Sequence, residues 1–181
     1  MKLAVFCGST TGNEPAYIEA ARALGRWIGE NGHTLVYGGG NTGLMGALAE
    51  AAHLAGSHVI GVLPENVEFI RSRPQPWCNE VILAENMAAR KQTMLELADA
   101  FFALPGGVGT LDEITDAITL AHIGVFRKPS ILVNTNGYYE PLRELLQRMS
   151  GADFFHMGKE PYILFSDDLR EIGAFLENRN A

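Results

Sequence analysis

The sequence places three glycines and two carboxylates side by side in one short segment, PGGVGTLDE at 105–113. Gly106, Gly107 and Gly109 follow an apolar run, and a glycine-rich turn that enters a helix lets backbone N–H groups approach a phosphate closely. Asp112 and Glu113 come directly afterwards, although carboxylates repel phosphate. The segment lacks the Gly-Lys-Ser/Thr ending of a triphosphate-binding loop, so we expect it to bind a monophosphate.

The acids of this segment allow two interpretations. Thr110 and Glu113 have the T-x-x-E spacing of a capping box, in which the glutamate accepts a hydrogen bond from the amide of the capping residue. In the other interpretation the phosphate uses those amides, and Glu113, one turn into the helix, lies beside the ligand rather than on its anionic end. Asp112 suits the positive end of a helix dipole and needs no further role.

A cationic pair, Arg90 and Lys91, lies in the segment NMAARKQTM. Met87, Arg90 and Met94 share one helix face through their i+3 and i+4 spacing. Positive charge in the first turns of a helix opposes the helix dipole, so Arg90 has a small local cost that a bound anion would offset. The alternative is a solvated basic pair on the surface.

A second glycine segment, GGGNTGLMG at 38–46, contains Gly38, Gly40 and Gly43 in the order G-x-G-x-x-G. This pattern between a strand and a helix is typical of a dinucleotide-binding turn. Here it follows the second predicted strand rather than the first, and the acid expected about 20 residues further on is replaced only by the more distant Glu65. Close packing in a tight turn explains the pattern equally well.

Short apolar runs alternate with segments of helical periodicity along the whole chain, which predicts a parallel sheet buried on both faces. The expected strands are 2–7, 34–38, 58–63, 80–84, 100–104, 130–134 and 162–165. The expected helices are 15–30, 43–55, 87–98, 110–123, 138–149 and 167–178. We therefore predict an α/β protein: a single doubly wound, Rossmann-like domain over 1–181, with a mainly parallel sheet of about seven strands flanked by helices.

Three predicted strands end in unusual loops, at 8–10, 38–46 and 105–110. In doubly wound sheets, ligands bind beyond the carboxyl ends of the strands. Because each loop leads into a helix, we expect backbone N–H groups and helix dipoles to converge on one crevice. The long irregular segment 64–79 is expected to contact a ligand or a partner.

Composition narrows the class of protein further. The formal net charge is −7 and the 14 Lys and Arg residues are scattered, which argues against a nucleic-acid polymer as partner. No apolar run approaches the ~20 residues of a membrane span. Cys7 and Cys78 form no CxxC pattern, which argues against a zinc site and a disulfide framework, so we expect a reduced, cytoplasmic protein with no metal site.

Several of these segments together resemble the Lonely Guy (LOG) family. They are FCGS at the N-terminus, GGGNTGLMG, M-x-x-R-K-x-x-M, PGGVGTLDE and KPSILVNTNGYY. The resemblance implies a phosphoribohydrolase that releases free cytokinin from its riboside 5′-monophosphate, and a homodimer at minimum. Members are often called lysine decarboxylases, but a pyridoxal enzyme needs a Schiff-base lysine and a partner for the pyridinium. The residues around the four lysines do not supply this arrangement.

The resemblance also implies roles for individual residues. Arg90 and Glu113 match the catalytic pair of the family. The 5′-phosphate would be held by Gly106, Gly107, Val108, Gly109 and Thr110. Ligand-lining positions are matched by Ser9, Gly39, Gly40, Gly43, Met87 and Lys91. The chain departs from the family at Ala88 and Ala89, where His-Glu is common, and at Leu120–His122, where Trp-x-Gln is common.

The implied reaction gives Glu113 a function beside the phosphate-binding loop. Cleavage of an N-glycosidic bond develops positive charge on the ribose, which a carboxylate stabilises while phosphate binding fixes the sugar beside it. No metal ion or redox cofactor is required. A non-catalytic nucleotide sensor remains an alternative, and an NAD-dependent oxidoreductase a more distant one. The base, plain adenine or a prenylated adenine, is not fixed by the sequence.

Overall fold

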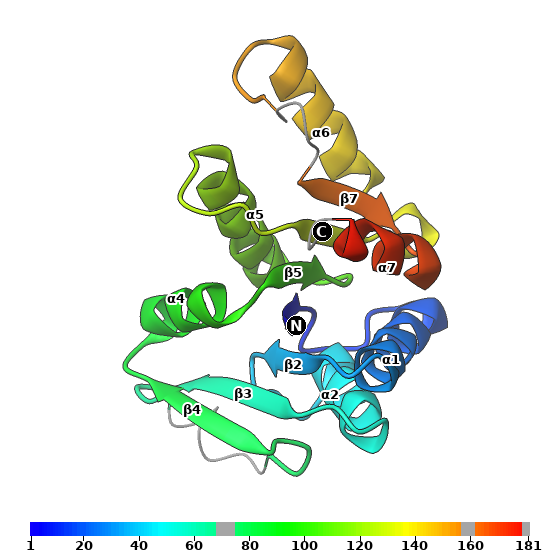
Figure 1. Cartoon of the computed structure of the whole chain (residues 1–181), viewed down its shortest axis with the longest axis vertical. Coiled ribbons are helices and arrows are strands. Elements are labelled where there is room, and N and C mark those ends of the chain that lie inside the picture. Colours follow the sequence, from blue (N-terminus) through cyan, green and yellow to red (C-terminus); the bar gives the residue numbers. More distant parts are fainter. Residues whose placement is uncertain (68–74, 157–161, 179–181) are drawn as a thin grey trace.

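Seven parallel strands form the centre of the molecule in the order β4-β3-β2-β1-β5-β6-β7 (Figure 1). The structure is a computed structural model that describes residues 1–67, 75–156 and 162–178. Every strand pairing in these ranges is parallel. The predicted doubly wound α/β class is therefore confirmed.

The elements lie where the periodicity predicts them, with ends that shift by a few residues. The strands are β1 (Lys2–Phe6), β2 (Thr34–Tyr37), β3 (Val59–Pro64), β4 (Glu80–Ala84), β5 (Ala100–Ala103), β6 (Ser130–Val133) and β7 (Ile163–Ser166). The helices are α1 (Pro15–Glu30), α2 (Gly43–Leu54), α4 (Met87–Leu97), α5 (Val108–His122), α6 (Glu140–Gly151) and α7 (Leu169–Glu177). Within the long segment expected at 64–79, Pro64 belongs to β3, and 68–74 lie outside the described residues.

The core lies on both faces of the sheet because successive strand residues point in opposite directions. In β1, Leu3 and Val5 pack into the cluster beneath α1, α2 and α7, whereas Ala4 and Phe6 pack into the cluster beneath α4, α5 and α6. Figure 1 shows the two groups of helices on opposite sides of the sheet. A continuous apolar strand therefore supplies two cores at once.

The strand order reverses direction between β1 and β5, which places a switch point at the centre of the sheet. Chains leaving these two strands turn to opposite faces, so a crevice opens at their carboxyl ends. The loops that begin at Gly8 and Pro105 meet there, and the Gly8 N–H donates to the Pro105 carbonyl at 3.1 Å. The loop at 38–42 follows the adjacent strand β2.

Candidate active site

A cavity of about 700 Å³ lies at the carboxyl ends of β1, β2 and β5 and extends to the N-terminal turns of α4 and α5. Most of the residues predicted to bind substrate line it: Ser9, Gly39, Gly40, Met87, Arg90, Gly107, Val108, Gly109, Thr110 and Glu113. Three predicted residues, Gly43, Gly106 and Lys91, are not among the described residues that line this cavity. The prediction that the loops after β1, β2 and β5 border one crevice is confirmed.

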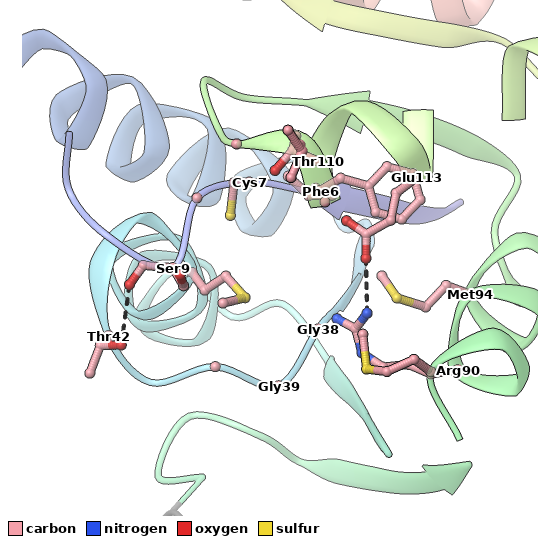
Figure 2. A pocket seen from close by; sticks show the side chains of 18 of the residues that line it. Phe6, Cys7, Ser9, Gly38, Gly39, Thr42, Arg90, Met94, Thr110 and Glu113 are labelled. Atoms are coloured by element: carbon pink, nitrogen blue, oxygen red, sulfur yellow. Dashed lines mark hydrogen bonds and ion pairs between the residues drawn. The ribbon is translucent and has the colours of Figure 1, made fainter. Parts of the chain in front are cut away.

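Arg90 and Glu113 meet inside the cavity, where Nη1 of Arg90 donates to Oε1 of Glu113 at 2.8 Å. Figure 2 shows the two side chains pointing toward one another from α4 and α5. Both are mostly buried, with side-chain exposures of 9% and 14%. The interpretation of Arg90 as a solvated surface cation is therefore wrong.

Backbone groups fix the position of the guanidinium. Nε of Arg90 donates to the Val62 carbonyl, near the end of β3, at 3.0 Å. Gly38, directly after β2, lies against the other side of the guanidinium, where a β-carbon would lie 3.2 Å from Cζ of Arg90. Sequence reasoning assigned no such role to Gly38 or Val62, because neither residue carries a functional side chain.

Burial dominates the electrostatics of Glu113. It raises the pKa of this carboxyl above the usual value of 4.5, even though the charge and hydrogen bond of Arg90 lower it. The Cys7 thiol, which also lines the cavity, has its pKa raised by burial and additionally by the negative charge of Glu113. Near neutral pH the site therefore holds a thiol that stays protonated beside a carboxylate that protonates more readily than usual.

The glycine loop presents backbone amides to the same cavity. Gly107 caps α5 without a side chain, and the Leu111 N–H donates to the Gly107 carbonyl at 3.1 Å, so the amides of residues 108–110 precede the first helical hydrogen bond. The capping-box interpretation is wrong, because α5 begins at Val108, two residues earlier than predicted, and Thr110 lies inside the helix. The carboxylate of Glu113 instead turns to Arg90.

A second, smaller cavity of about 370 Å³ adjoins the first and shares Gly8, Ser9 and Gly107 with it. Its walls include Gly106 and the hydroxyl-bearing loop 9–11. The Tyr138 hydroxyl donates to the Gly106 carbonyl at 2.6 Å and so fixes the glycine loop from the other side. The expectation that a helix begins at Tyr138 is corrected, since α6 begins two residues later, at Glu140.

Two predicted residues have structural surroundings that differ from the expectation. Nζ of Lys91 lies 3.0 Å from Asp112 and 3.1 Å from Asp116, so this lysine bridges α4 and α5 outside the cavity. A β-carbon at Gly43, whose φ is 61°, would lie 2.5 Å from the Thr10 backbone nitrogen. Gly43 therefore lets the loops after β1 and β2 approach closely, which is the packing alternative for the G-x-G-x-x-G pattern.

Comparison with known proteins identifies relatives over nearly the whole chain. A family model described as possible lysine decarboxylase matches residues 45–175. A cytokinin riboside 5′-monophosphate phosphoribohydrolase of Arabidopsis thaliana is 40% identical over 97% of this chain and 81% of its own length. One of Rhodococcoides fascians is 38% identical over 91% of this chain and 83% of its own length.

The chain belongs to the LOG family. Solved structures with the same fold include the molybdenum cofactor binding protein of Rippkaea orientalis, with a TM-score of 0.76 and 22% identity over 99% of this chain and 97% of that one. The molybdenum cofactor carrier protein of Chlamydomonas reinhardtii has a TM-score of 0.72 and 21% identity over 99% of this chain and 96% of that one. At these identities the likeness establishes the fold of this LOG-family chain and nothing of its chemistry.

The lysines of this LOG-family member do not fit the description of its family model. Lys91 is held by two carboxylates, and Lys128 donates to the Leu95 carbonyl at 2.8 Å. In the part of the chain that the structure describes, no lysine lines the large cavity. A decarboxylase that forms a Schiff base would need one there; Lys159 lies outside the described residues.

The departures from the family pattern lie at the N-terminus of α4 and at the C-terminus of α5, the two helices that carry Arg90 and Glu113. Ala88 and Ala89 occupy the first turn of α4, directly before Arg90, and neither lines the large cavity as described. Leu120–His122 form the last turn of α5, where Nδ1 of His122 lies 3.1 Å from the His156 carbonyl. Their effect on base preference stays a prediction.

Proposed function

We propose that this chain hydrolyses the N-glycosidic bond of adenine-type nucleoside 5′-monophosphates, releasing the free base and ribose 5-phosphate. The observation that carries the proposal is the buried Arg90–Glu113 pair inside a cavity bordered by a glycine loop. Relatives that are about 40% identical are named as phosphoribohydrolases, which supports the same reaction. The substrates proposed are AMP and cytokinin riboside 5′-monophosphates.

The glycine loop would hold the 5′-phosphate. Amides 108–110 lie at the positive end of the α5 dipole, and β-carbons at Gly107 and Gly109 would meet no neighbour within 4 Å, so the backbone there is open to a ligand. Lys91, by contrast, is occupied by two carboxylates outside the cavity. Phosphate binding would therefore rest on backbone donors rather than on this lysine.

Glu113 would act on the ribose. As the bond from C1′ to the base nitrogen breaks, its electron pair leaves with the base and positive charge develops on C1′ and the ring oxygen. The ionised carboxylate would stabilise that charge and orient a water molecule. The water oxygen then bonds to C1′, one of its protons goes to the departing base, and the other remains on the new ribose hydroxyl.

Arg90 would orient this carboxylate or contact the ribose hydroxyls. Its charge also opposes the burial that raises the pKa of Glu113, so it keeps the carboxylate ionised at lower pH than burial alone would allow. The cost of placing this cation near the start of α4 is then offset by Glu113 and by the Val62 carbonyl.

Three methionines among the residues that line the cavity suit an apolar, planar base. Met45, Met87 and Met94 are these residues, and thioether side chains adapt to flat or irregular apolar groups. They are compatible with adenine and with an adenine that carries an apolar tail. The choice between the two substrates is therefore a matter for a rate comparison.

The test is to incubate the protein with AMP and with isopentenyladenosine 5′-monophosphate and to measure free base and ribose 5-phosphate by chromatography. Stoichiometric release of both products is expected. Binding of either nucleotide without turnover at high protein concentration would refute the proposal and favour a nucleotide sensor. Tight NAD binding without cleavage would favour an oxidoreductase.

We further propose that the chain works as a homodimer in the cytoplasm. The LOG-family resemblance supports the dimer, and two free cysteines, Cys7 and Cys78, support a reducing compartment. No helix in the described ranges has the length and apolar character needed to cross a bilayer. Sedimentation equilibrium should give twice the mass of the chain, and a monomer over the whole concentration range would refute this part of the proposal.

A further inference from the structure

Gly38 lies in contact with the guanidinium of Arg90, directly after the end of β2. A β-carbon at position 38 would overlap Nη2 of Arg90 and lie 3.2 Å from its Cζ. The next neighbour, Sδ of Met45 at 3.3 Å, is near the end of a flexible side chain that can move aside. Figure 2 shows the loop at Gly38 passing close to the guanidinium.

The backbone of Gly38 does not by itself require glycine. Its neighbour Gly39 has a φ of 72°, in the left-handed region that favours glycine, but Gly38 is not among the glycines with positive φ. An alanine at position 38 would therefore fit the turn. The atoms that it would meet first belong to Arg90.

The guanidinium is thus enclosed on three sides by three elements. The Val62 carbonyl of β3 accepts from Nε, Glu113 of α5 accepts from Nη1, and Gly38 lies at Nη2. We propose that Gly38 is a positioning residue, which holds Arg90 on Glu113 by leaving room for its guanidinium. The effect on catalysis rests on the proposed hydrolase function, whereas the effect on the ion pair does not.

Gly38→Ala should separate Arg90 from Glu113 while leaving the phosphate loop intact. We expect kcat to fall on the order of 10²-fold, because a displacement of about 1 Å in a catalytic pair has effects of that size. KM should change by less than about threefold, since the lost interaction acts in the transition state.

The acid limb of the kcat profile should also move to higher pH. The charged and titratable groups that face Glu113 are Arg90 and Lys91 of α4, Asp112 of α5 and Cys7 after β1. Arg90 is the nearest cation, and its displacement removes a charge that keeps the carboxylate ionised. A variant with lower kcat but an unmoved limb would contradict the proposal.

A double-mutant cycle separates positioning from a general effect on the fold. In an Arg90→Gln background the shorter side chain leaves room for a methyl group, so adding Gly38→Ala should change kcat by less than about twofold. An equal loss in both backgrounds would overturn the proposal. If Gly38→Ala alone does not fold, the double variant should have the higher Tm, and an equally unstable double variant would overturn it as well.

A titration of Glu113 by carbon-13 NMR tests the proposal independently of turnover. Gly38→Ala should raise the pKa of Glu113 above its wild-type value, and an unchanged pKa would overturn the proposal even in an active enzyme. A wild-type protein without turnover would refute the proposed function and leave this result standing. Gly151→Ala, at the end of α6 where a β-carbon meets nothing within 4 Å, is the matched control and should change neither kcat nor the Glu113 pKa.

Discussion

Arg90 and Lys91, adjacent residues of α4, both form ion pairs with carboxylates of α5. Arg90 of α4 pairs with Glu113 of α5 at 2.8 Å, with both side chains mostly buried in the cavity. Lys91, the next residue, pairs with Asp112 at 3.0 Å, where the side-chain exposures are 23% and 66%. The inner pair, Arg90–Glu113, therefore lies in the cavity, whereas the outer pair, Lys91–Asp112, lies at the partly exposed surface.

The difference lies in burial rather than in distance. An exposed pair is weakened by water and salt and contributes about 0–1 kcal/mol. A buried pair loses hydration, and removing one partner leaves an unpaired charge at a cost of about 3–5 kcal/mol. In the inner pair, burial raises the pKa of Glu113, the proposed catalytic carboxylate. Partial burial lowers the pKa of Lys91, but the hydrogen bonds that this lysine donates to Asp112 and Asp116 outweigh it and raise the pKa. The outer pair therefore holds the helices together, and the inner pair is the candidate for catalysis.

Glu113→Gln should have the largest effect on activity. The amide keeps the shape of the side chain but removes the charge that would stabilise the developing cation, so kcat should fall by about 10³-fold. The measurement is base release from AMP or isopentenyladenosine 5′-monophosphate, together with nucleotide binding by calorimetry. Asp112→Asn, the same change at the outer pair, is the matched control and should keep kcat within about threefold. Equal losses in the two variants would remove the distinction between the pairs.

The acid limb of the wild-type kcat profile should lie above the pH expected for an ordinary glutamate. The proposed reaction needs ionised Glu113, burial raises its pKa, and activity is lost as the pH falls through that raised pKa. Arg90→Gln removes the main opposing charge, so the limb should move further up and kcat should fall by about 10²-fold. Rate measurements between pH 4 and pH 8 test this, and a limb that moves downward would contradict the assignment.

Lys91→Ala should affect stability slightly and chemistry hardly at all. The loss of the partly exposed contacts to Asp112 and Asp116 should lower the free energy of unfolding by about 0.5–1 kcal/mol. Because Lys91 does not line the described cavity, kcat should stay within about threefold of wild type. Urea unfolding and the base-release assay measure the two effects. A large rise in KM would show instead that Lys91 leaves its aspartates to bind the phosphate.

The smallest expected effect concerns salt. At an ionic strength of 1 M the Debye length falls to about 3 Å, so the stability difference between wild type and Lys91→Ala should become unmeasurable. The inner pair is shielded from solvent, so raising the ionic strength to 1 M should move the pH of the acid limb by less than about 0.3 units. If salt shifted the acid limb of the kcat profile as strongly as it reduces the contribution of Lys91 to stability, both ion pairs would be solvated.

The sequence by itself determined the strands, the helices and the edge of the sheet at which the site lies. Apolar runs and helical spacing indicate which residues of each element are buried, and glycine segments indicate the turns that follow β1, β2 and β5. These features are local, and the periodicity of the chain encodes them directly. Arg90 and Glu113 were identified as a pair only through the resemblance to the LOG family, because their local spacing also fits a surface cation and a capping box.

Tertiary structure alone decided which charges meet. The spacing of Thr110 and Glu113 fits a capping box, but α5 begins at Val108, so the carboxylate is free to reach an arginine 23 residues away. No sequence pattern predicts the contact of Gly38 with that arginine, because Gly38 contributes only by having no side chain where the guanidinium lies. Such contacts depend on how α4 and α5 pack across the end of the sheet, and the geometry of that packing is set by the whole core rather than by the residues that use it.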